Sequence, residues 1–374
     1  MISKKVTHLI TTIERGGAEK QLLTLASEQV QSGIKVEVIF LKGKPELEKE
    51  FEESGVEVNK LLAGEGFLKQ IFLLSKYLRK NPSPIHAHLP KSELLAAIVI
   101  SNKYLVFTRH NSEPFWPGGP RVISNFLSKF VCKRASQGIA ISNAVKSYLV
   151  KRGEITTGYT IDVVYYGFQK DTSTNPAGLD LITNAMAGQS SNFKIGTIGR
   201  LVPQKDYPTL LSAFSNVLKR FPHTKLYVVG EGYLQKELIE LSESLGINGK
   251  VHWLGKTEYI KEFLSEIDLF ILPSKYEGFG LVLLEAMVAK KPIIAANNSA
   301  IPEVLGKTYE GLFSTGDAKA LAQHINTAIS DKNFSKRLLQ SYASQLDLFD
   351  SSDMNKYVRN IYSNAGFNLM LKSN

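Results

Sequence analysis

The segment that most constrains the fold spans residues 273–287, with the sequence PSKYEGFGLVLLEAM. Before it, residues 268–272 form a short apolar run bounded by a proline, which predicts a buried strand. After it, residues 280–289 are apolar and rich in helix formers, so the whole segment predicts strand, loop and helix. Because glycine has no Cβ, Gly278 and Gly280 would let a ligand approach the backbone where the helix N-terminus offers N–H groups to an anion.

Two glutamates flank this helix start. Glu277 lies on the predicted loop and Glu285 inside the predicted helix. Eight residues at a helical rise of 1.5 Å separate them by at most about 12 Å along the axis. This is the span needed if a diphosphate lies at the helix tip with a polyol on either side. Two solvent-exposed glutamates on one helix face are the alternative, but the glycines, the strand and the helix tip together favour a ligand site.

Length and composition indicate a soluble protein of two domains. The chain has 374 residues, of which 43% are hydrophobic and 21% charged. The longest apolar run, residues 94–100, is too short for a membrane span, and the first residues show no signal peptide. Cys132 is the single cysteine, which excludes an internal disulfide and a cysteine-based zinc cluster. A cytoplasmic location is therefore expected.

The net charge of +10 is concentrated in the first half of the chain. Residues 1–165 carry 23 Lys and Arg against 15 Asp and Glu, or +8. A basic first half predicts attraction to an anionic partner: a membrane surface, a phosphorylated substrate or nucleic acid. The sequence shows no helix-turn-helix, zinc-finger or RNA-binding signature, so no nucleic-acid partner is expected.

Alternating strand-like and helix-like segments predict two doubly wound parallel sheets, an α/β fold with two Rossmann-like domains facing each other across a cleft. We place the first domain at residues 1–168 and the second at 193–350. Residues 169–192, rich in Thr, Ser, Asn, Ala and Gly, are predicted to be a linker. The predicted strands are 6–12, 35–40, 56–60, 85–87, 104–108, 138–141, 193–199, 225–229, 251–254, 269–272 and 292–295.

Candidate binding residues of the second domain follow the ends of its strands, where ligands bind in such sheets. Arg200 and Lys205 follow the strand 193–199, and both suit phosphate oxygens. Glu231 lies in a Gly-Glu-Gly turn, for which an ordinary turn is the alternative. Leu254 ends another strand and would form a wall of a base-binding slot, with a plain buried strand as the alternative.

In the first domain, Gly16 and Gly17 follow a strand and open a helix, which suits an anion or the close approach of a sugar. The pattern is not G-x-G-x-x-G, so a nicotinamide dinucleotide is disfavoured. His88 and His110 also follow strands and are candidates to face the cleft, His110 more so. Structural or surface histidines are the alternative for both.

The sequence predicts no metal site. It contains no Asp-x-Asp motif and no His, Asp or Glu cluster at metal-ligand spacing. A bound diphosphate would then be neutralised by Arg200, Lys205 and helix N-termini instead of a divalent cation.

These motifs together resemble the family 4 retaining glycosyltransferases of the GT-B fold. The resemblance covers nearly the whole chain and is most specific in the second half. The matching second-half elements, in order, are Arg200 with Lys205, the turn 230–232, Glu277 with Glu285, and the sequence IPEV at 301–304. The matching first-half elements are the Gly16-Gly17 loop and the segments 86–88, 108–110 and 139–142.

The resemblance implies a role for each donor-site residue. Arg200 and Lys205 would bind the diphosphate of a nucleotide sugar, and Glu285 the ribose hydroxyls. Glu277 would bind hydroxyls of the transferred sugar, and the backbone of Gly280, Leu281 and Val282 would approach the donor.

The resemblance also implies that His110 lines the reacting centre from the other domain. Residues 351–374 would contain a helix, over about 351–370, that returns to the first domain. Asp206 departs from the family pattern, since many members have glycine after the lysine, and so does the sequence KTYE at 307–310.

The implied activity is transfer of a sugar from a nucleotide-diphosphate sugar, with UDP-sugars as the commonest donors, to a saccharide or lipid-linked saccharide of a cell-surface polysaccharide. No cofactor is expected beyond the nucleotide-sugar cosubstrate. A sugar-nucleotide epimerase or hydrolase of the same fold, and a non-catalytic nucleotide-sugar-binding module, remain as alternatives.

We hypothesise that the acceptor is membrane-associated and that the protein contacts the cytoplasmic face of the inner membrane. The basic first half and the loop PFWPGGP at 114–120 motivate this hypothesis. A helix over residues 67–80 is a second candidate for membrane contact, although packing against the sheet with its lysines outward is favoured for it. Lipopolysaccharide and other surface polysaccharides are the expected products.

Overall fold

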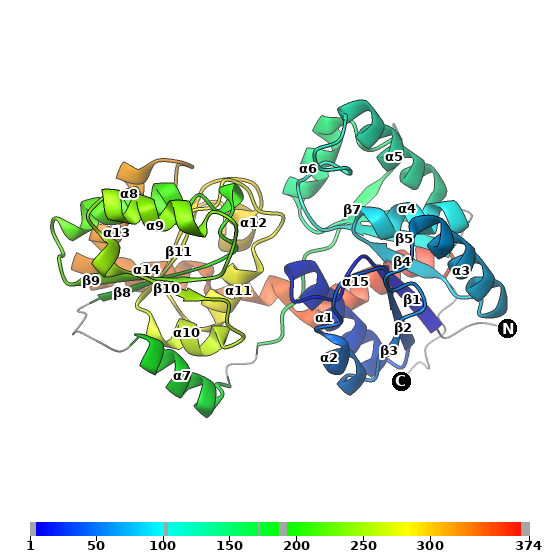
Figure 1. Ribbon diagram of the computed structural model, residues 1–374, viewed down its shortest axis with the longest axis horizontal. Helices are drawn as coiled ribbons and strands as arrows, with labels where there is room; N and C mark the ends of the chain where they lie inside the picture. Colours follow the sequence, from blue (N-terminus) through cyan, green and yellow to red (C-terminus); the bar gives the residue numbers. More distant parts are fainter. Residues whose placement is uncertain (1–4, 101–103, 157, 171–172, 187–192, 368–374) are drawn as a thin grey trace. The chain divides into compact units, whose positions relative to one another are not determined.

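The computed structural model of the chain describes residues 5–100, 104–156, 158–170, 173–186 and 193–367. It divides into two compact units (Figure 1). Unit 1 comprises residues 1–169 and 349–374, and unit 2 comprises residues 170–348. Each unit is an α/β fold built on one parallel sheet, which confirms the predicted fold class.

Unit 1 contains a seven-stranded sheet with strand order β3-β2-β1-β4-β5-β6-β7. Because the order reverses between β1 and β4, the connections that leave these two strands run in opposite directions, which opens a crevice at their carboxyl ends. The strands are β1 (Lys5–Ile10), β2 (Lys35–Phe40), β3 (Glu57–Asn59), β4 (Ile85–His88), β5 (Leu105–Arg109), β6 (Gln137–Ala140) and β7 (Ile161–Val163).

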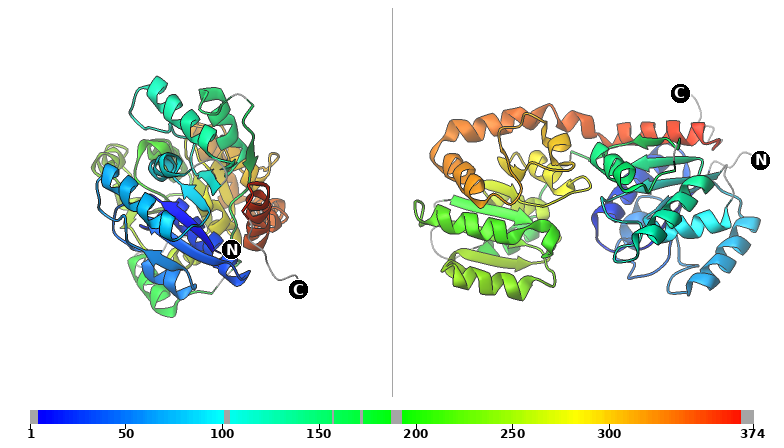
Figure 2. Two further views of the ribbon diagram at one scale, coloured as in Figure 1. Left: turned by 90° about the vertical axis from the view of Figure 1, so that its right-hand side faces the viewer. Right: turned by 90° about the horizontal axis from the view of Figure 1, so that it is seen from above.

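Helices cover both faces of this sheet (Figure 2). On one face α4 packs against β1, β4 and β5, with α3 and α5 on either side of it. On the other face α1 and α15 pack against each other and bury a core of aliphatic residues from β1 and β2. The helices are α1 (Gly17–Gln31), α2 (Glu48–Glu53), α3 (Phe67–Lys80), α4 (Pro90–Val99), α5 (Arg121–Arg134), α6 (Asn143–Arg152) and α15 (Ser351–Asn364).

Unit 2 contains a six-stranded sheet with strand order β10-β9-β8-β11-β12-β13, which reverses between β8 and β11. The strands are β8 (Phe193–Ile198), β9 (Thr224–Val229), β10 (Val251–Gly255), β11 (Leu269–Leu272), β12 (Ile293–Ala296) and β13 (Leu312–Phe313). The helices are α7 (Pro176–Met186), η2 (Pro203–Lys205), α8 (Tyr207–Leu218), α9 (Gln235–Ser244), η3 (Asn248–Lys250), α10 (Ile260–Glu266), α11 (Leu281–Val288), α12 (Ile301–Leu305), α13 (Ala318–Ser330), α14 (Lys332–Ala343) and η4 (Leu346–Phe349).

All the predicted strands are present, with ends that differ by at most two residues. The sequence did not reveal β7 and β13, which have three and two residues. Segments this short show no periodicity, so only pairing with β6 and β12 identifies them as strands.

The segment predicted as a linker contains a helix that belongs to unit 2. Within residues 169–192, α7 packs on α10. At Gly178 a Cβ would lie 2.3 Å from the Tyr259 ring, so the glycine permits this close packing. Gly178, one of the small residues on which the linker prediction rests, therefore serves a helix contact, which composition does not reveal. Residues 171–172 and 187–192 lie outside the described residues.

The last described helix, α15, belongs to unit 1 although it follows unit 2 in the sequence. Val358 and Ile361 are buried in the unit 1 core, and Tyr362 is fully buried. The Tyr362 hydroxyl accepts a hydrogen bond from Gln29 Nε2 at 3.2 Å and lies 2.7 Å from His86 Nδ1. The predicted end of this helix, at residues 368–370, lies outside the described residues.

No helix among the described residues is both long and apolar enough to cross a bilayer.

We expect Tyr362→Phe to lower the free energy of unfolding by about 1–3 kcal/mol, because it leaves buried groups of Gln29 and His86 without their partner. Tyr357→Phe is the control, since Tyr357 lies on the same helix but is 63% exposed. Equilibrium urea unfolding followed by circular dichroism measures both. Equal stability of the two variants would contradict the role that we assign to the Tyr362 hydroxyl.

Candidate functional site

In unit 2 two of the predicted donor-site residues lie on loops that flank the point where the strand order of the sheet reverses. The loop after β8 carries Lys205, and the loop after β11 carries Glu277. These loops leave neighbouring strands in opposite directions, so the crevice between them is where an open α/β sheet binds its ligand.

Lys205 and Glu277 form an ion pair that joins these two loops. Lys205 Nζ lies 2.6 Å from Glu277 Oε1, and the side chains are 14% and 8% exposed. Backbone and amide contacts support the pair: Lys275 donates its N–H to the Gln204 carbonyl at 2.7 Å, and Gln204 Nε2 donates to the Tyr276 carbonyl at 2.9 Å. The structure therefore brings together two predicted residues that lie far apart in the sequence.

Asp206, which departs from the family pattern, has a left-handed backbone with φ of 49°. Glycine adopts this conformation freely and aspartate tolerates it better than most residues, which explains both the common glycine and its replacement here. Asp206 also accepts a hydrogen bond from the Thr209 hydroxyl at 2.8 Å and lies 3.5 Å from Lys275 Nζ. The substitution thus preserves the loop that carries Lys205.

Two residues that sequence reasoning missed fix the Glu277 loop. The Glu277 N–H donates to Ser299 Oγ at 2.8 Å, and Ser299 Oγ donates to Asn298 Oδ1 at 2.7 Å. Asn298 Nδ2 in turn donates to the Ser274 carbonyl at 2.9 Å. A run of polar residues directly after the apolar strand β12 was the available signal.

Gly280 precedes α11 with a left-handed backbone, φ 90°, which only glycine adopts without strain. The chain therefore enters the helix through a residue without a Cβ, and the approach of a ligand to this loop stays a prediction. Leu281 and Val282 form the first turn of α11, and Glu285, one turn further on, is half-buried. The N–H groups of a first helical turn point out of the helix toward any bound anion.

The remaining predicted donor-site residues lie at or just after the ends of β8, β9 and β10. Arg200 is exposed, and Leu254 is half-buried at the end of β10. Glu231 Oε1 accepts the Lys256 N–H at 3.3 Å. The glycines on either side of Glu231 are required by packing, because a Cβ at Gly230 would lie 2.1 Å from the Gly199 carbonyl oxygen.

In unit 1 the loop after β1 contains Gly16, the residue before α1. A Cβ at Gly16 would lie 2.4 Å from Glu19 Oε2. Glu19 is largely buried in the first turn of α1, and its other carboxylate oxygen accepts a hydrogen bond from the Thr12 hydroxyl at 2.7 Å. A protein carboxylate therefore already lies at this helix N-terminus, which disfavours the binding of an external anion beside Gly16 and Gly17. Close approach by a neutral sugar is the prediction that remains for this loop.

His88 and His110 are hydrogen-bonded to each other, with His88 Nδ1 3.0 Å from His110 Nε2. His110 Nδ1 lies 2.6 Å from the Tyr166 hydroxyl. Burial lowers the pKa of His110 to about 3, so its ring is neutral near pH 7. A cavity of about 30 Å³ beside these rings holds a water or two but is too small for a sugar.

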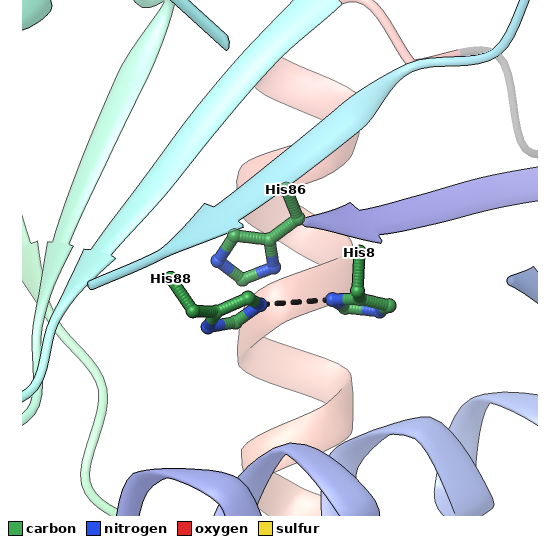
Figure 3. Close-up of side chains that lie close together, drawn as sticks. All are labelled: His8, His86 and His88. Atoms are coloured by element: carbon green, nitrogen blue, oxygen red, sulfur yellow. Dashed lines mark hydrogen bonds between the residues drawn. The ribbon is translucent and has the colours of Figure 1, made fainter. Parts of the chain in front are cut away.

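The fold also brings His8 close to His86 and His88, and one ring nitrogen from each of the three lies within 4.8 Å of the other two (Figure 3). The sequence did not show this cluster because His8 comes from β1, which pairs with β4. Although three imidazoles suit a metal, all six of these nitrogens have hydrogen-bond partners among the described residues. The cluster also lacks a carboxylate to neutralise a divalent cation, so its present contacts favour hydrogen bonding over metal binding.

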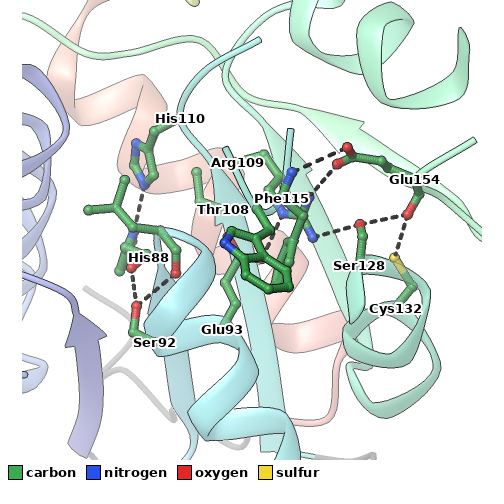
Figure 4. A network of polar contacts seen from close by, with 12 residues as sticks. His88, Ser92, Glu93, Thr108, Arg109, His110, Phe115, Ser128, Cys132 and Glu154 are labelled. Atoms are coloured by element: carbon green, nitrogen blue, oxygen red, sulfur yellow. Dashed lines mark hydrogen bonds and ion pairs between the residues drawn. The ribbon is translucent and has the colours of Figure 1, made fainter. Parts of the chain in front are cut away.

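Arg109, which precedes His110, points to the opposite face of the sheet and enters a buried charged network (Figure 4). Its Nε lies 2.6 Å from Glu93 Oε2 and its NH1 3.5 Å from Glu154 Oε2. The guanidinium also donates to Ser128 Oγ at 3.0 Å and lies 4.7 Å from the Phe115 ring centre. This network ties β5 to α4 and α5 and fixes the strand end that carries His110.

Two family models match the chain, one in each half. Residues 15–168 match the model described as Glycosyltransferase Family 4. Residues 186–344 match the model described as Glycosyl transferases group 1.

Two curated relatives of this chain are named as transferases of sugars. The lipopolysaccharide core biosynthesis glycosyltransferase LpsE of Rhizobium meliloti is 28% identical over 145 residues, which span 38% of this chain and 42% of that protein. A longer match, 25% identical over 365 residues, covers 93% of this chain and 95% of the Campylobacter jejuni GalNAc-alpha-(1->4)-GalNAc-alpha-(1->3)-diNAcBac-PP-undecaprenol alpha-1,4-N-acetyl-D-galactosaminyltransferase.

The crystal structure of Anabaena HepE in complex with UDP and glucose has the same fold. Its TM-score is 0.81, and the match covers 96% of this chain and 99% of that chain at 23% sequence identity.

We expect Glu93 to make stability depend on pH. Burial raises the pKa of Glu93 to about 7, against the opposing effect of Arg109, so the folded protein binds a proton that the unfolded chain has released above about pH 4.5. The contribution of Glu93 to the free energy of unfolding must therefore fall as the pH rises from about 4.5 to 7. Glu93→Gln should lose this slope, whereas Glu52→Gln, which removes an exposed carboxylate from α2, should keep it. Urea titrations at several pH values test this, and an unchanged slope in Glu93→Gln would refute it.

Proposed function

This chain belongs to the glycosyltransferases of the GT-B fold, and from that membership we propose that it transfers a sugar, with retention of anomeric configuration, from a UDP-sugar to a saccharide or lipid-linked saccharide acceptor. The product would be part of a cell-surface polysaccharide. The observation that carries the proposal is the Lys205–Glu277 pair across the β8/β11 reversal. A cation suited to phosphate and a carboxylate suited to sugar hydroxyls lie side by side there.

Each part of the donor has a proposed partner in unit 2. The diphosphate would bind Lys205, Arg200 and the N-terminus of α11, where the N–H groups of Leu281 and Val282 point. Glu277 would accept hydrogen bonds from the transferred sugar and Glu285 from the ribose. Leu254 and Glu231 would lie beside the base. Protein cations and the helix dipole would neutralise the diphosphate without a divalent metal.

Catalysis would consist mainly of leaving-group stabilisation. The bond between the anomeric carbon and the phosphate oxygen breaks, and negative charge develops on the departing UDP while the sugar becomes cationic. An acceptor hydroxyl oxygen bonds to the anomeric carbon, and its proton passes to the departing phosphate or to solvent. Lys205 and Arg200 act where that negative charge develops, which lowers the energy of the transition state more than that of the bound donor.

A surface of unit 1 supports contact with a lipid-linked acceptor at the cytoplasmic face of a membrane. Along α5, Val122, Phe126, Lys129 and Lys133 recur at spacings of four, three and four residues and are all exposed, with Val122 and Phe126 at 80% and 68%. Trp116, in the preceding loop, is 46% exposed. Apolar side chains beside lysines suit the interface of an anionic bilayer.

Helix α3 adds a similar stripe. Leu68 and Phe72 are 82% and 64% exposed, next to exposed Lys69 and Lys76. The lysines of this helix point outward, as the favoured interpretation of packing against the sheet expects, but Leu68 and Phe72 are exposed beside them. Only Gln70 and Leu74 of α3 are buried.

The donor is tested by a thermal-shift panel of UDP-, GDP- and ADP-sugars in the presence of EDTA. We expect a UDP-sugar to raise the melting temperature most, since binding to the folded state stabilises it by mass action. Lys205→Met should weaken UDP affinity by about tenfold to a hundredfold, the usual range for a contact to a charged group. Lys236→Met, at an 88% exposed side chain on α9, should leave the affinity unchanged.

Turnover completes this test. Unchanged UDP affinity in Lys205→Met, or transfer abolished by EDTA, would refute the metal-independent donor site. Release of free or epimerised sugar without transfer to any acceptor would favour the epimerase or hydrolase alternative.

Membrane contact is tested by flotation with vesicles containing phosphatidylglycerol. We expect the protein to float at low salt and to be released at high salt, because screening weakens its attraction to anionic lipid. The double variant Val122→Ser/Phe126→Ser should lose flotation. The control Leu181→Ser/Tyr233→Ser removes exposed apolar side chains from unit 2 and should float as the natural protein does. Flotation of both variants would place the contact elsewhere.

A further inference from the structure

The buried histidines of unit 1 form one continuous chain of hydrogen bonds. It runs from Gln29 Oε1 to His8 Nε2 at 2.8 Å, and from His8 Nδ1 to His88 Nε2 at 2.9 Å. It continues from His88 Nδ1 to His110 Nε2 at 3.0 Å and ends at the Tyr166 hydroxyl, 2.6 Å from His110 Nδ1. The chain crosses α1, β1, β4 and the end of β5, so it links the core of unit 1 to the half-buried ring of His110.

The histidine rings in this chain of hydrogen bonds are neutral. Burial lowers the pKa of His8 to about 4 and holds the pKa of His88 well below its ordinary value, where repulsion from the neighbouring histidines adds to the effect. Burial also lowers the pKa of His110. Burial, together with the carboxylate of Glu19, holds the pKa of Tyr166 well above its ordinary range, so its hydroxyl keeps a proton to donate.

Because the rings are neutral, every hydrogen bond in this series must donate in the same direction. A neutral imidazole has one nitrogen that donates and one that accepts. Because the amide oxygen of Gln29 only accepts, His8 must carry its proton on Nε2 and accept at Nδ1. His88 must then donate from Nε2 and accept at Nδ1, and His110 must do the same, with Tyr166 donating to its Nδ1.

A second branch from Gln29 agrees with this assignment. Gln29 Nε2 donates to the Tyr362 hydroxyl, which lies 2.7 Å from His86 Nδ1. Since that hydroxyl accepts from Gln29, it donates to His86 Nδ1, and His86 donates from Nε2 to the Thr108 hydroxyl at 2.7 Å. One placement of protons therefore satisfies both branches, with all four rings protonated on Nε2.

We propose that Gln29, His8 and His88 are positioning residues that set the tautomer and orientation of His110. The single amide of Gln29 fixes the direction of both branches, so a residue in the core of unit 1 determines which nitrogen of His110 carries the proton. While the chain is intact, both nitrogens of His110 are engaged, and His110 serves as an oriented neutral group and not as a general base. Its link to turnover rests on the proposed function, in which His110 lines the reacting centre.

The tautomers are tested directly by ¹⁵N NMR of the full chain labelled at its histidines, which number seven. Single His→Gln variants assign the signals of the four network histidines. We expect these four to show the Nε2–H tautomer alone and to remain neutral from pH 8 to pH 5. A signal of the Nδ1–H tautomer, or protonation of His8, His88 or His110 within that range, would overturn the proposal. This measurement needs no substrate, so it decides the tautomers even if the proposed transferase activity fails.

The effect on turnover is tested with Gln29→Leu, which removes both the oxygen that accepts from His8 and the N–H that donates to Tyr362. We expect its His110 signals to show a mixture of tautomers and its kcat to fall by about tenfold to a hundredfold, with the KM for the donor within twofold. Gln21→Leu is the control, because Gln21 is also buried on α1 but donates to the Gly167 carbonyl. An unchanged kcat in Gln29→Leu, or an equal loss in Gln21→Leu, would overturn the positioning role.

Discussion

Burial of both faces of the two parallel sheets is the constraint on which the rest of the structure depends. A polar atom inside such a sheet costs free energy unless it has a hydrogen-bond partner, so polar residues either follow the strand ends or form complete networks within. In unit 2 the polar residues of the candidate site follow the strand ends: β11 and β12 are wholly apolar, and the site lies on the loops beyond them. In unit 1 polar residues lie within the strands themselves. His8, His86 and His88 belong to β1 and β4, and they form hydrogen bonds with each other and with residues of α1 and α15.

Features set by neighbouring residues could be predicted from the sequence. The apolar run of β11, the glycine before α11 and the helix itself follow from local composition, and the structure reproduces them. Lys205 and Glu277 were each identified as candidates because both follow a strand, and strand ends meet at one edge of a parallel sheet. Their ion pair could not be predicted, because it depends on which strands are neighbours.

The same reason explains what the sequence left hidden in unit 1. His88 and His110 were individual candidates, but their link to His8 and Gln29 requires the pairing of β1 with β4 and the packing of α1 on that face. The sequence around a histidine in an apolar strand does not show whether its ring nitrogens have hydrogen-bond partners. Likewise, the composition of residues 169–192 predicts a linker, because the contact that gives Gly178 of α7 its role is with Tyr259, a residue far away in the sequence.

The two units also differ in how they treat charge, and the difference suits the proposed reaction. Lys205 and Glu277 retain some exposure, so their mutual attraction is partly screened and a diphosphate can compete for the lysine. His110 is neutral, with both nitrogens engaged. The proposed function assigns a positive charge to the leaving group, through Lys205, and an oriented uncharged ring to His110. The contacts within each unit account for both states, since partial exposure leaves the lysine charged and able to exchange its partner, whereas burial keeps the imidazole neutral.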